Sequence, residues 1–299
     1  MRRPDPSARA RVLRRARGLS MGAVLACGLV TSGCSLVLRR ATADLADHLS
    51  AAVLDHDDPA TVESGAPAFL LLLEGLIRAD PENVPLLTAA ARLYGTYASV
   101  FVQEPERAGR LASRGRRFGQ RALCARDREL CGQLDAPFES FAASLARTSR
   151  ADIDVVYGLG AAWATWISIH SDDWNAVADL PRVEALMARV IELDETFDDG
   201  GAHLYLGVLQ SQRPAALGGR PEEGRRHFER ADALASGRNL MVKVMLAQYY
   251  ARLVFDRDLH DRLLNEVVGA DAQIEGYALS NRLAQREAQR LLQGADDYF

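Results

Sequence analysis

The sequence predicts an all-α protein built of stacked antiparallel helical hairpins. Apolar residues recur at spacings of three and four along most of the chain, and Ala, Leu, Arg and Glu dominate the segments. No stretch alternates apolar and polar residues for long, as a strand with one buried face would. Short connections between the helical segments favour antiparallel neighbours.

Helix boundaries are predicted from prolines at helix starts and from glycines and capping residues near helix ends. In chain order the expected breaks are Asp57 to Pro59, Asp80 to Asn83, Glu104-Pro105, Ala136-Pro137, Ser171 to Asp173, Asp179 to Pro181, Phe197 to Gly201, residues 213–224 and Ser236-Gly237. A helix is expected in each interval between two breaks. At the break before Trp174, we expect the polar residues around His170 to cap a short helix.

Small and large residues recur at the spacings of a degenerate tetratricopeptide-like repeat array. The partial matches are Leu87, Ala90, Ala91 and Tyr94, then Gly115, Gly119 and Ala122, then Gly224, Phe228 and Ala231, then Val242, Met245, Leu246 and Tyr249. Small side chains let the two helices of a hairpin approach, and large ones fill the gap to the next hairpin. An ordinary helical bundle is the alternative, since it also shows such intervals.

The beginning of the chain has the composition of an export signal. Seven arginines and a single acid, Asp5, precede an apolar run from Leu19 to Val30. This run fits the roughly 7–15 residues of a signal peptide's apolar core and is shorter than the roughly 20 residues of a spanning helix. A membrane span is therefore disfavoured.

The apolar run ends in TSGC at Cys34, which resembles the lipobox of bacterial lipoproteins. The third position before this cysteine is Thr31, where Leu, Val or Ile is usual. Cys27 is an alternative lipobox cysteine, because the third position before it is Val24, a usual residue there. Cleavage at Cys27 would, however, leave an apolar run of only eight residues in the signal. The resemblance implies that Cys34 is acylated and anchors the protein to a membrane. The alternative is an ordinary cleaved signal in which Cys34 has no role.

Cleavage at this point would leave residues 34–299, expected to form a single helical-repeat domain, after a lipoprotein signal peptide of residues 1–33. Removing the signal takes away seven of the 36 basic and one of the 40 acidic residues, so the remaining 29 and 39 give a net charge of −10. Such a domain is a poor match for nucleic acid, which requires a positive face.

Cys124 and Cys131 remain after cleavage, and an exported chain permits a disulfide between them. On one unbroken helix their Cα atoms would lie roughly 10 Å apart, too far for the ~5.5 Å of a disulfide. The bond therefore requires the helix to break near Arg126 to Glu129. The alternative is two buried thiols.

A more specific resemblance lies mainly in the second half of the chain. It is carried by GLGAAWATWIS, DLPRVEALMARVIELD, DDGGAHLYLGVLQSQRPAALGGRPEEGRRHFERADAL, NLMVKVMLAQYYAR and RLLNEVVGADAQIEGYALSNRLAQREAQRLL, in which ALGGRPEEGRRHFERA is the most specific piece. In this order behind a lipobox, these segments resemble the TatT family, the T component of tetratricopeptide-repeat-associated TRAP transporters. The likeness covers nearly all of the mature chain and is strongest from 157 to 292.

This resemblance implies a periplasmic lipoprotein with tetratricopeptide-like hairpins that forms a homotrimer. It implies one partner, the periplasmic substrate-binding P component of a TRAP transporter. The ligand is not settled by the family's motifs, and a small hydrophobic or organic-acid molecule is the usual suggestion. Because Ser35 follows Cys34, rather than the Asp that usually retains lipoproteins at the inner membrane, we expect an anchor in the outer membrane.

No motif of an enzyme, metal site or cofactor site occurs in the sequence. It lacks the Gly-x-Ser-x-Gly nucleophile turn, the phosphate-binding glycine loop, the His-Glu-x-x-His zinc helix and Cys-x-x-Cys. The six histidines are scattered singly, so we expect no metal site, no cofactor and no catalytic residue.

Two groups of residues are candidates for binding. Arg110, Arg114, Arg117 and Arg121 share one helical stripe, which is either a solvated face or a docking stripe for an acidic partner or an anionic lipid. Trp163 and Trp166 lie beside small residues on one helix and are either core or the wall of an apolar pocket, which Tyr205, Tyr249, Tyr250 and Asn281 would complete.

The leading hypothesis is a non-enzymatic, lipid-anchored periplasmic accessory protein of a TRAP transporter. It would dock the substrate-binding P component and bind or hand over a small ligand. The alternative is an envelope lipoprotein of tetratricopeptide type that scaffolds outer-membrane or cell-wall assembly and has no ligand pocket.

Overall fold

The computed structural model describes residues 51–299, which belong to one compact unit, residues 48–299. These residues form helices joined by short loops and contain no strand, which confirms the predicted all-α class. Cys34 and the predicted signal peptide lie outside the described residues. The repeat relationship between hairpins stays a prediction.

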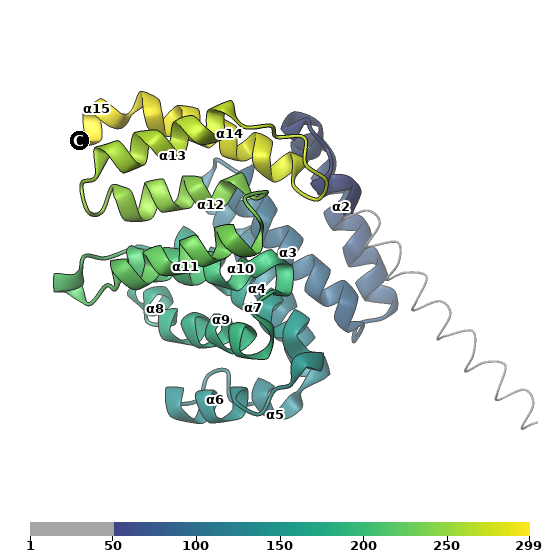
Figure 1. The fold of residues 1–299 in the computed structure, drawn as a ribbon. Helices are drawn as coiled ribbons and strands as arrows, with labels where there is room; N and C mark the ends of the chain where they lie inside the picture. Colours follow the sequence, from purple (N-terminus) through teal and green to yellow (C-terminus); the bar gives the residue numbers. More distant parts are fainter. Residues whose placement is uncertain (1–50) are drawn as a thin grey trace, which may run out of the picture. The chain divides into compact units, whose positions relative to one another are not determined.

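The first half of the described chain contains α2 (Pro59–Ala79), α3 (Val84–Val100), α4 (Pro105–Arg126), α5 (Arg128–Cys131), α6 (Phe138–Leu145), η1 (Arg150–Asp152), α7 (Ile153–Ile169), α8 (Trp174–Val177) and α9 (Leu180–Asp194) (Figure 1). The second half contains η2 (Phe197–Gly200), α10 (Gly201–Ser211), η3 (Ala215–Leu217), α11 (Pro221–Leu234), α12 (Leu240–Met245), η4 (Leu246–Ala251), α13 (Arg257–Gly269), α14 (Ala278–Gln293) and α15 (Ala295–Tyr298).

All the helix breaks predicted from proline and glycine fall at or beside element boundaries. Further breaks, at residues 146–149, 252–256, 270–277 and 294, were not predicted, and none of them contains a proline. At the second of these breaks a polar side chain caps the following helix: Asp256 accepts from the Leu259 amide of α13 at 2.9 Å. Asp173 caps α8 in the predicted way, accepting from the Asn175 amide at 2.9 Å.

Consecutive helices pack as hairpins, with α3 against α4, α10 against α11 and α13 against α14. The small residues predicted at these contacts are required because the two helices of each hairpin lie close together. A Cβ on Gly115 would lie 3.1 Å from the Ala91 carbonyl oxygen, and one on Gly224 would lie 2.8 Å from the Gly207 carbonyl oxygen. Any side chain at Gly115 or Gly224 would therefore push the two helices apart.

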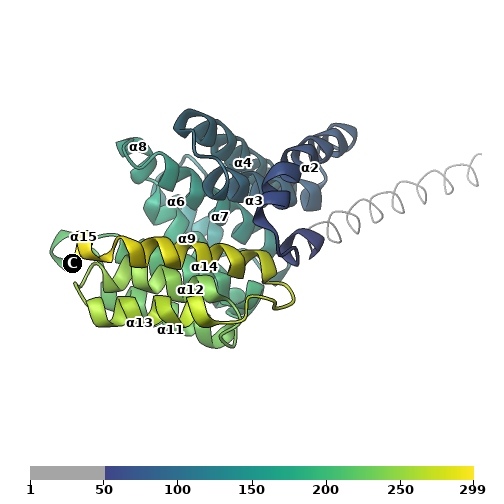
Figure 2. The ribbon, with the colours of Figure 1, turned by 90° about the horizontal axis from the view of Figure 1, so that it is seen from above.

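The C-terminal helices share one apolar core. Figure 2 shows α14 beside α12 and α13, and buried side chains of these helices and of α11 meet between them. Phe228 of α11, Val244 of α12 and Leu264 of α13 are fully buried there. This core fixes the segment from α12 to η4, which forms one wall of the cavity described below.

Of the described helices, α2 is the one long and apolar enough to cross a membrane by length and composition. One stripe of it packs inward, and this stripe contains Val62, Ala66, Leu70, Leu73 and Ile77. Leu71 and Leu72, on the opposite side, are exposed. The inward stripe is the pattern of a helix that covers a protein core.

The segment η4 is a π-helix inserted directly after α12. The Arg252 amide donates to the Ala247 carbonyl oxygen at 3.2 Å, five residues back rather than four. Such a turn holds one residue more than an α-helix of the same length, and π turns occur often at functional sites. Here it carries Tyr249, which lies on the cavity wall.

Candidate functional site

A cavity of about 740 Å³ lies between α7, α10, the α12–η4 segment and the loop before α14. This volume is in the range of small-molecule pockets in proteins. Its apolar wall contains Ala164, Ile167, Leu204, Val208, Leu209 and Met245. The rest of the lining is polar, and its charged groups gather around one short turn, η2.

The backbone of η2 is left-handed at three successive residues, two of which are not glycine. Asp198 has φ of 53°, Asp199 has φ of 50° and Gly200 has φ of 83°, all in the left-handed region. For residues other than glycine this region costs roughly 1–3 kcal/mol each, unless surrounding contacts impose it. We call Asp198 and Asp199 the acidic turn.

Asp198 is bound by groups from the first half of the described chain. Its carboxylate accepts a hydrogen bond from Arg92 Nη2 of α3 at 3.0 Å and one from the Tyr157 hydroxyl of α7 at 2.6 Å. The Arg92 guanidinium also lies over the Tyr157 ring, 5.2 Å from its centroid. Burial, and then the charge of Asp198, raises the pKa of Tyr157 well above its usual value, so the hydroxyl keeps its proton and donates.

Asp199 has the same kind of partners, taken from the second half. Its carboxylate accepts from Arg238 Nη2 at 3.0 Å and from the Tyr277 hydroxyl at 2.5 Å. The Arg238 guanidinium lies 5.4 Å from the Tyr277 ring centroid. The acidic turn is therefore fixed from both sides by an arginine and a tyrosine, and it joins the two halves of the chain at the polar end of the cavity.

Two of the predicted pocket residues, Tyr205 and Tyr249, line this cavity. Burial raises the pKa of Tyr205 to about 12, so its hydroxyl is neutral at pH 7.

Asn281 lies behind the wall: its amide donates to the Arg238 carbonyl at 3.0 Å and its oxygen accepts from the Leu240 amide at 3.0 Å. It positions Arg238 rather than facing the cavity. Tyr250 is also outside the lining, and its hydroxyl donates to Glu222 at 2.8 Å.

The two predicted pocket tryptophans do not line the cavity. Trp163 is 1% exposed, and its indole N–H donates to Asp179 at 3.2 Å. The Trp166 indole N–H donates to Ser113 Oγ of α4 at 3.1 Å. Between them lies the Arg116 guanidinium, 4.4 Å from the Trp163 ring and 4.1 Å from the Trp166 ring. The pair therefore packs α7 against α4 through a cation–π contact.

The predicted arginine stripe lies on the exposed side of α4, and half of it has structural partners. Arg114 pairs with Glu74 of α2 at 2.6 Å, and Arg121 donates to the Pro81 carbonyl at 2.9 Å. Arg110 has a looser pair with exposed Glu106 at 3.7 Å. Arg117 forms no hydrogen bond or ion pair with any of residues 51–299. Three residues of the stripe line a surface hollow: Arg110, Arg114 and Arg117. Arg107, outside the stripe, lines the same hollow.

Cys124 and Cys131 are placed where a disulfide can form. Helix α4 ends at Arg126, and the Asp127 side chain accepts from the Glu129 and Leu130 amides to start α5. This break brings the two Cα atoms to 4.8 Å, with the sulfur atoms at bonding distance. The helix interruption that the bond requires is thus present.

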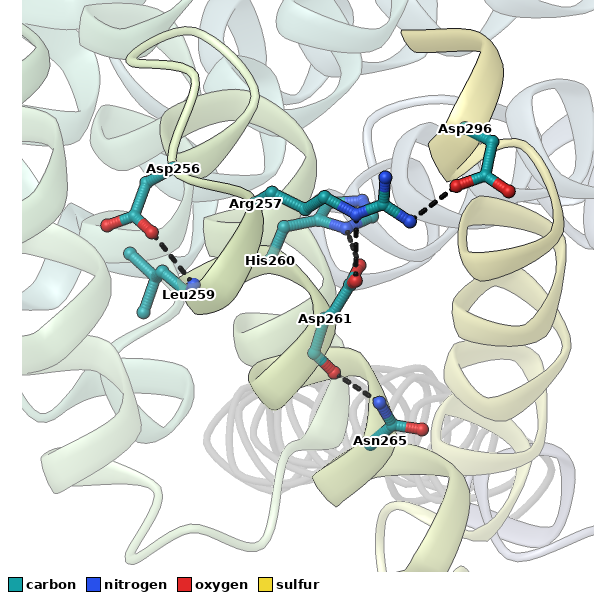
Figure 3. A network of polar contacts seen from close by, with 7 residues as sticks. All are labelled: Asp256, Arg257, Leu259, His260, Asp261, Asn265 and Asp296. Atoms are coloured by element: carbon teal, nitrogen blue, oxygen red, sulfur yellow. Dashed lines mark hydrogen bonds and ion pairs between the residues drawn. The ribbon is translucent and has the colours of Figure 1, made fainter. Parts of the chain in front are cut away.

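Residues 51–299 contain no group of three or more His, Cys, Asp and Glu side chains arranged to hold a metal ion. The buried His260 is part of a structural network, drawn in Figure 3. Its Nδ1 lies 2.8 Å from Asp261, and Arg257 binds both Asp261 at 3.3 Å and Asp296 of α15. The network ties α15 to α13, and none of its residues lines the cavity.

The model of one protein family, TAtT, the TRAP transporter T component, matches residues 55–299. The chain belongs to this family. A search of curated proteins gave no significant match. Membership makes this T component an accessory, envelope-associated part of a TRAP transporter that works with the other components of the transporter.

Proposed function

We propose that this T component binds a small apolar or amphipathic molecule in the cavity and docks the periplasmic substrate-binding P component of its transporter. The observation that carries the proposal is the cavity itself, with an apolar wall on one side and the acidic turn at the other. Apolar pockets with a few convergent polar groups are the usual form of ligand sites. Left-handed backbone at residues other than glycine is found often at ligand sites, and here it lies on the cavity wall.

Ligand binding is tested by filling the cavity. N-phenyl-1-naphthylamine, an uncharged fluorescent probe, should bind the wild type and gain fluorescence. Ala164→Phe places a ring in the cavity and should weaken binding at least tenfold, or about 1.4 kcal/mol. Ala125→Phe is the matched control, because Ala125 is exposed and does not line the cavity. Equal affinity in all three proteins would contradict a site in this cavity.

Docking is proposed to use the exposed part of the arginine stripe. Arg110 and Arg117 face the surface hollow on α4, and neither has a close buried partner. Guanidinium groups of this kind favour carboxylates on a partner surface and speed association. The partner face is therefore expected to be acidic.

Calorimetry with the cognate substrate-binding protein, ligand-free and loaded, tests the docking step. The Arg110→Gln and Arg117→Gln double variant should bind several-fold more weakly, and the loss should shrink as salt is raised. A control is Arg286→Gln, an exposed arginine on α14. Absence of heat and of co-elution for the wild type would favour the envelope scaffold instead.

We further propose that the protein is a periplasmic lipoprotein, acylated at Cys34 and anchored in the outer membrane. Cys34→Ser should move the protein from the membrane pellet to the soluble fraction, since the acyl chains provide the anchoring. A variant that stays in the pellet would contradict the anchor. Separation of inner and outer membranes tests the location, and light scattering of the anchor-free protein tests the homotrimer.

A further inference from the structure

The charges on the cavity wall discriminate between ligands. Five charged side chains line it, two arginines and three carboxylates. Arg92 is paired with Asp198 at 3.0 Å and Arg238 with Asp199 at 3.0 Å. The third carboxylate, Glu275, forms no hydrogen bond or ion pair with any residue in the described part of the chain. The wall therefore has one uncompensated negative charge.

The charges of the two arginines are already balanced by the acidic turn. Each guanidinium shares its carboxylate with a tyrosine hydroxyl, from Tyr157 on one side and Tyr277 on the other. A ligand carboxylate would compete with these aspartates for the two arginines, and the wall already has three carboxylates to repel it. An organic acid is thus disfavoured.

Glu275 lies at the edge of the cavity in the loop before α14. At this edge the Gly276 amide donates to the carboxylate of Asp55, and Gln273 donates to Asp57 at 2.9 Å. Leu54, next to Asp55, is itself part of the wall. Three carboxylates, from Asp55, Asp57 and Glu275, therefore gather around this loop, and their charge raises the local concentration of cations.

We propose that the cavity selects an amphipathic cation, with an amine or quaternary ammonium group at Glu275 and an apolar chain along Ile167, Leu204 and Val208. Tyr249, which also lines the cavity, adds an aromatic face, to which ammonium groups are attracted. This inference rests on the proposed ligand-binding function and specifies its ligand class.

Three probes of equal chain length separate the head groups: dodecyltrimethylammonium, dodecanol and dodecanoate, each below its micelle concentration at pH 7. Their affinities are measured by displacement of N-phenyl-1-naphthylamine and by the rise in melting temperature. The ammonium should bind at least tenfold more tightly than the carboxylate, with the alcohol between them.

Glu275→Gln should weaken binding of the ammonium about tenfold and leave the alcohol unchanged. Glu275→Lys should reverse the order of ammonium and carboxylate. Asp297→Asn removes an equal charge from exposed α15 and should change none of the affinities.

Equal binding of all three probes, or tightest binding of dodecanoate, would overturn the inference while the cavity remained a ligand site. Equal ammonium affinities of the Glu275→Gln and Asp297→Asn variants would also overturn the inference and leave the cavity as a ligand site. If none of the probes and no naphthylamine binds, the ligand-binding function itself is wrong, and the inference is overturned with it.

Discussion

His203 of α10 and His227 of α11 face each other with their Nδ1 atoms 2.7 Å apart. One nitrogen must donate and the other accept, so the contact requires at least one neutral ring. Burial lowers the pKa of His203, and burial together with the neighbouring His203 lowers the pKa of His227 to about 4. The pair is therefore neutral at pH 7.

This pair makes stability depend on pH. The charged groups that face it are Glu195 from the end of α9, and Arg220, Glu223, Arg226 and Arg230 around α11. Because the folded pKa is lowered, the unfolded chain binds more protons between pH 6.5 and about 4. The stabilisation is complete above pH 6.5 and is lost as the pH falls towards 4.

In numbers, acidification from pH 7 to 4.5 should remove roughly 1–2 kcal/mol through this pair after allowance for solvent screening. That corresponds to a fall of roughly 2–8 °C in melting temperature beyond the fall in a His227→Phe variant, measured by circular dichroism. A His56→Gln variant is the control, because His56 lies in the loop before α2. Parallel pH curves for wild type and His227→Phe would refute the effect.

Trp163→Ala should destabilise the fold by roughly 3–5 kcal/mol, since the side chain is buried and stacked on Arg116. The melting temperature should drop by roughly 6–20 °C. Trp174→Ala is the matched control: this tryptophan is 85% exposed, and its loss should change stability by no more than about 0.5 kcal/mol. Similar melting temperatures for the two variants would show that Trp163 is not core.

Cys124 and Cys131 should be oxidised in protein purified from an oxidising compartment. Mass spectrometry with alkylation, with and without prior reduction, should show the unreduced protein two hydrogens lighter and unalkylated at both sites. The Cys124→Ser and Cys131→Ser double variant should be less stable by ~2–3 kcal/mol on the chain-entropy estimate for so short a loop. Two alkylated thiols in the unreduced sample would contradict the bond.

Gly224→Ala should destabilise the α10–α11 hairpin by roughly 1–3 kcal/mol, because its methyl group would meet the Gly207 carbonyl oxygen at 2.8 Å. Gly65→Ala is the matched control on α2, where a Cβ meets nothing within 4 Å and alanine favours the helix by roughly 0.8–1.0 kcal/mol. Urea titrations should move the two midpoints in opposite directions. A shift in the same direction would argue against close helix packing at Gly224.

The hairpins were predictable from the sequence because the required information is local. The small residues at Gly115 and Gly224 stand at fixed spacings on their own helices, and that spacing alone determines which face can approach a neighbour. The arginine stripe was likewise placed on one face of α4. Its partners were not, since Glu74 and Pro81 belong to other elements.

The polar end of the cavity was not predictable in the same way. Phe197 to Gly201 reads as an ordinary loop, and the left-handed backbone of Asp198 and Asp199 depends on partners 106 and 78 residues distant, Arg92 and Tyr277. The role of the tryptophans could not be predicted from local sequence either. The spacing and scarcity of tryptophan are the same for a core residue and a pocket residue. What distinguishes them is contact with other elements, here the burial of Trp163 against Arg116 of α4.

The contacts between the loop before α14 and the start of the described chain affect the order of folding. Gln273 binds Asp57 across 216 residues of chain and Gly276 binds Asp55 across 221, so these bonds close very long loops. Loop-closure entropy delays such contacts, and a ribosome delivers the N-terminal partner long before the C-terminal one. Hairpins such as α3–α4 can form as soon as they are synthesised. The bonds of Gln273 and Gly276 to Asp57 and Asp55 cannot form until the loop before α14 has emerged. The cavity is therefore completed in the last stage of folding.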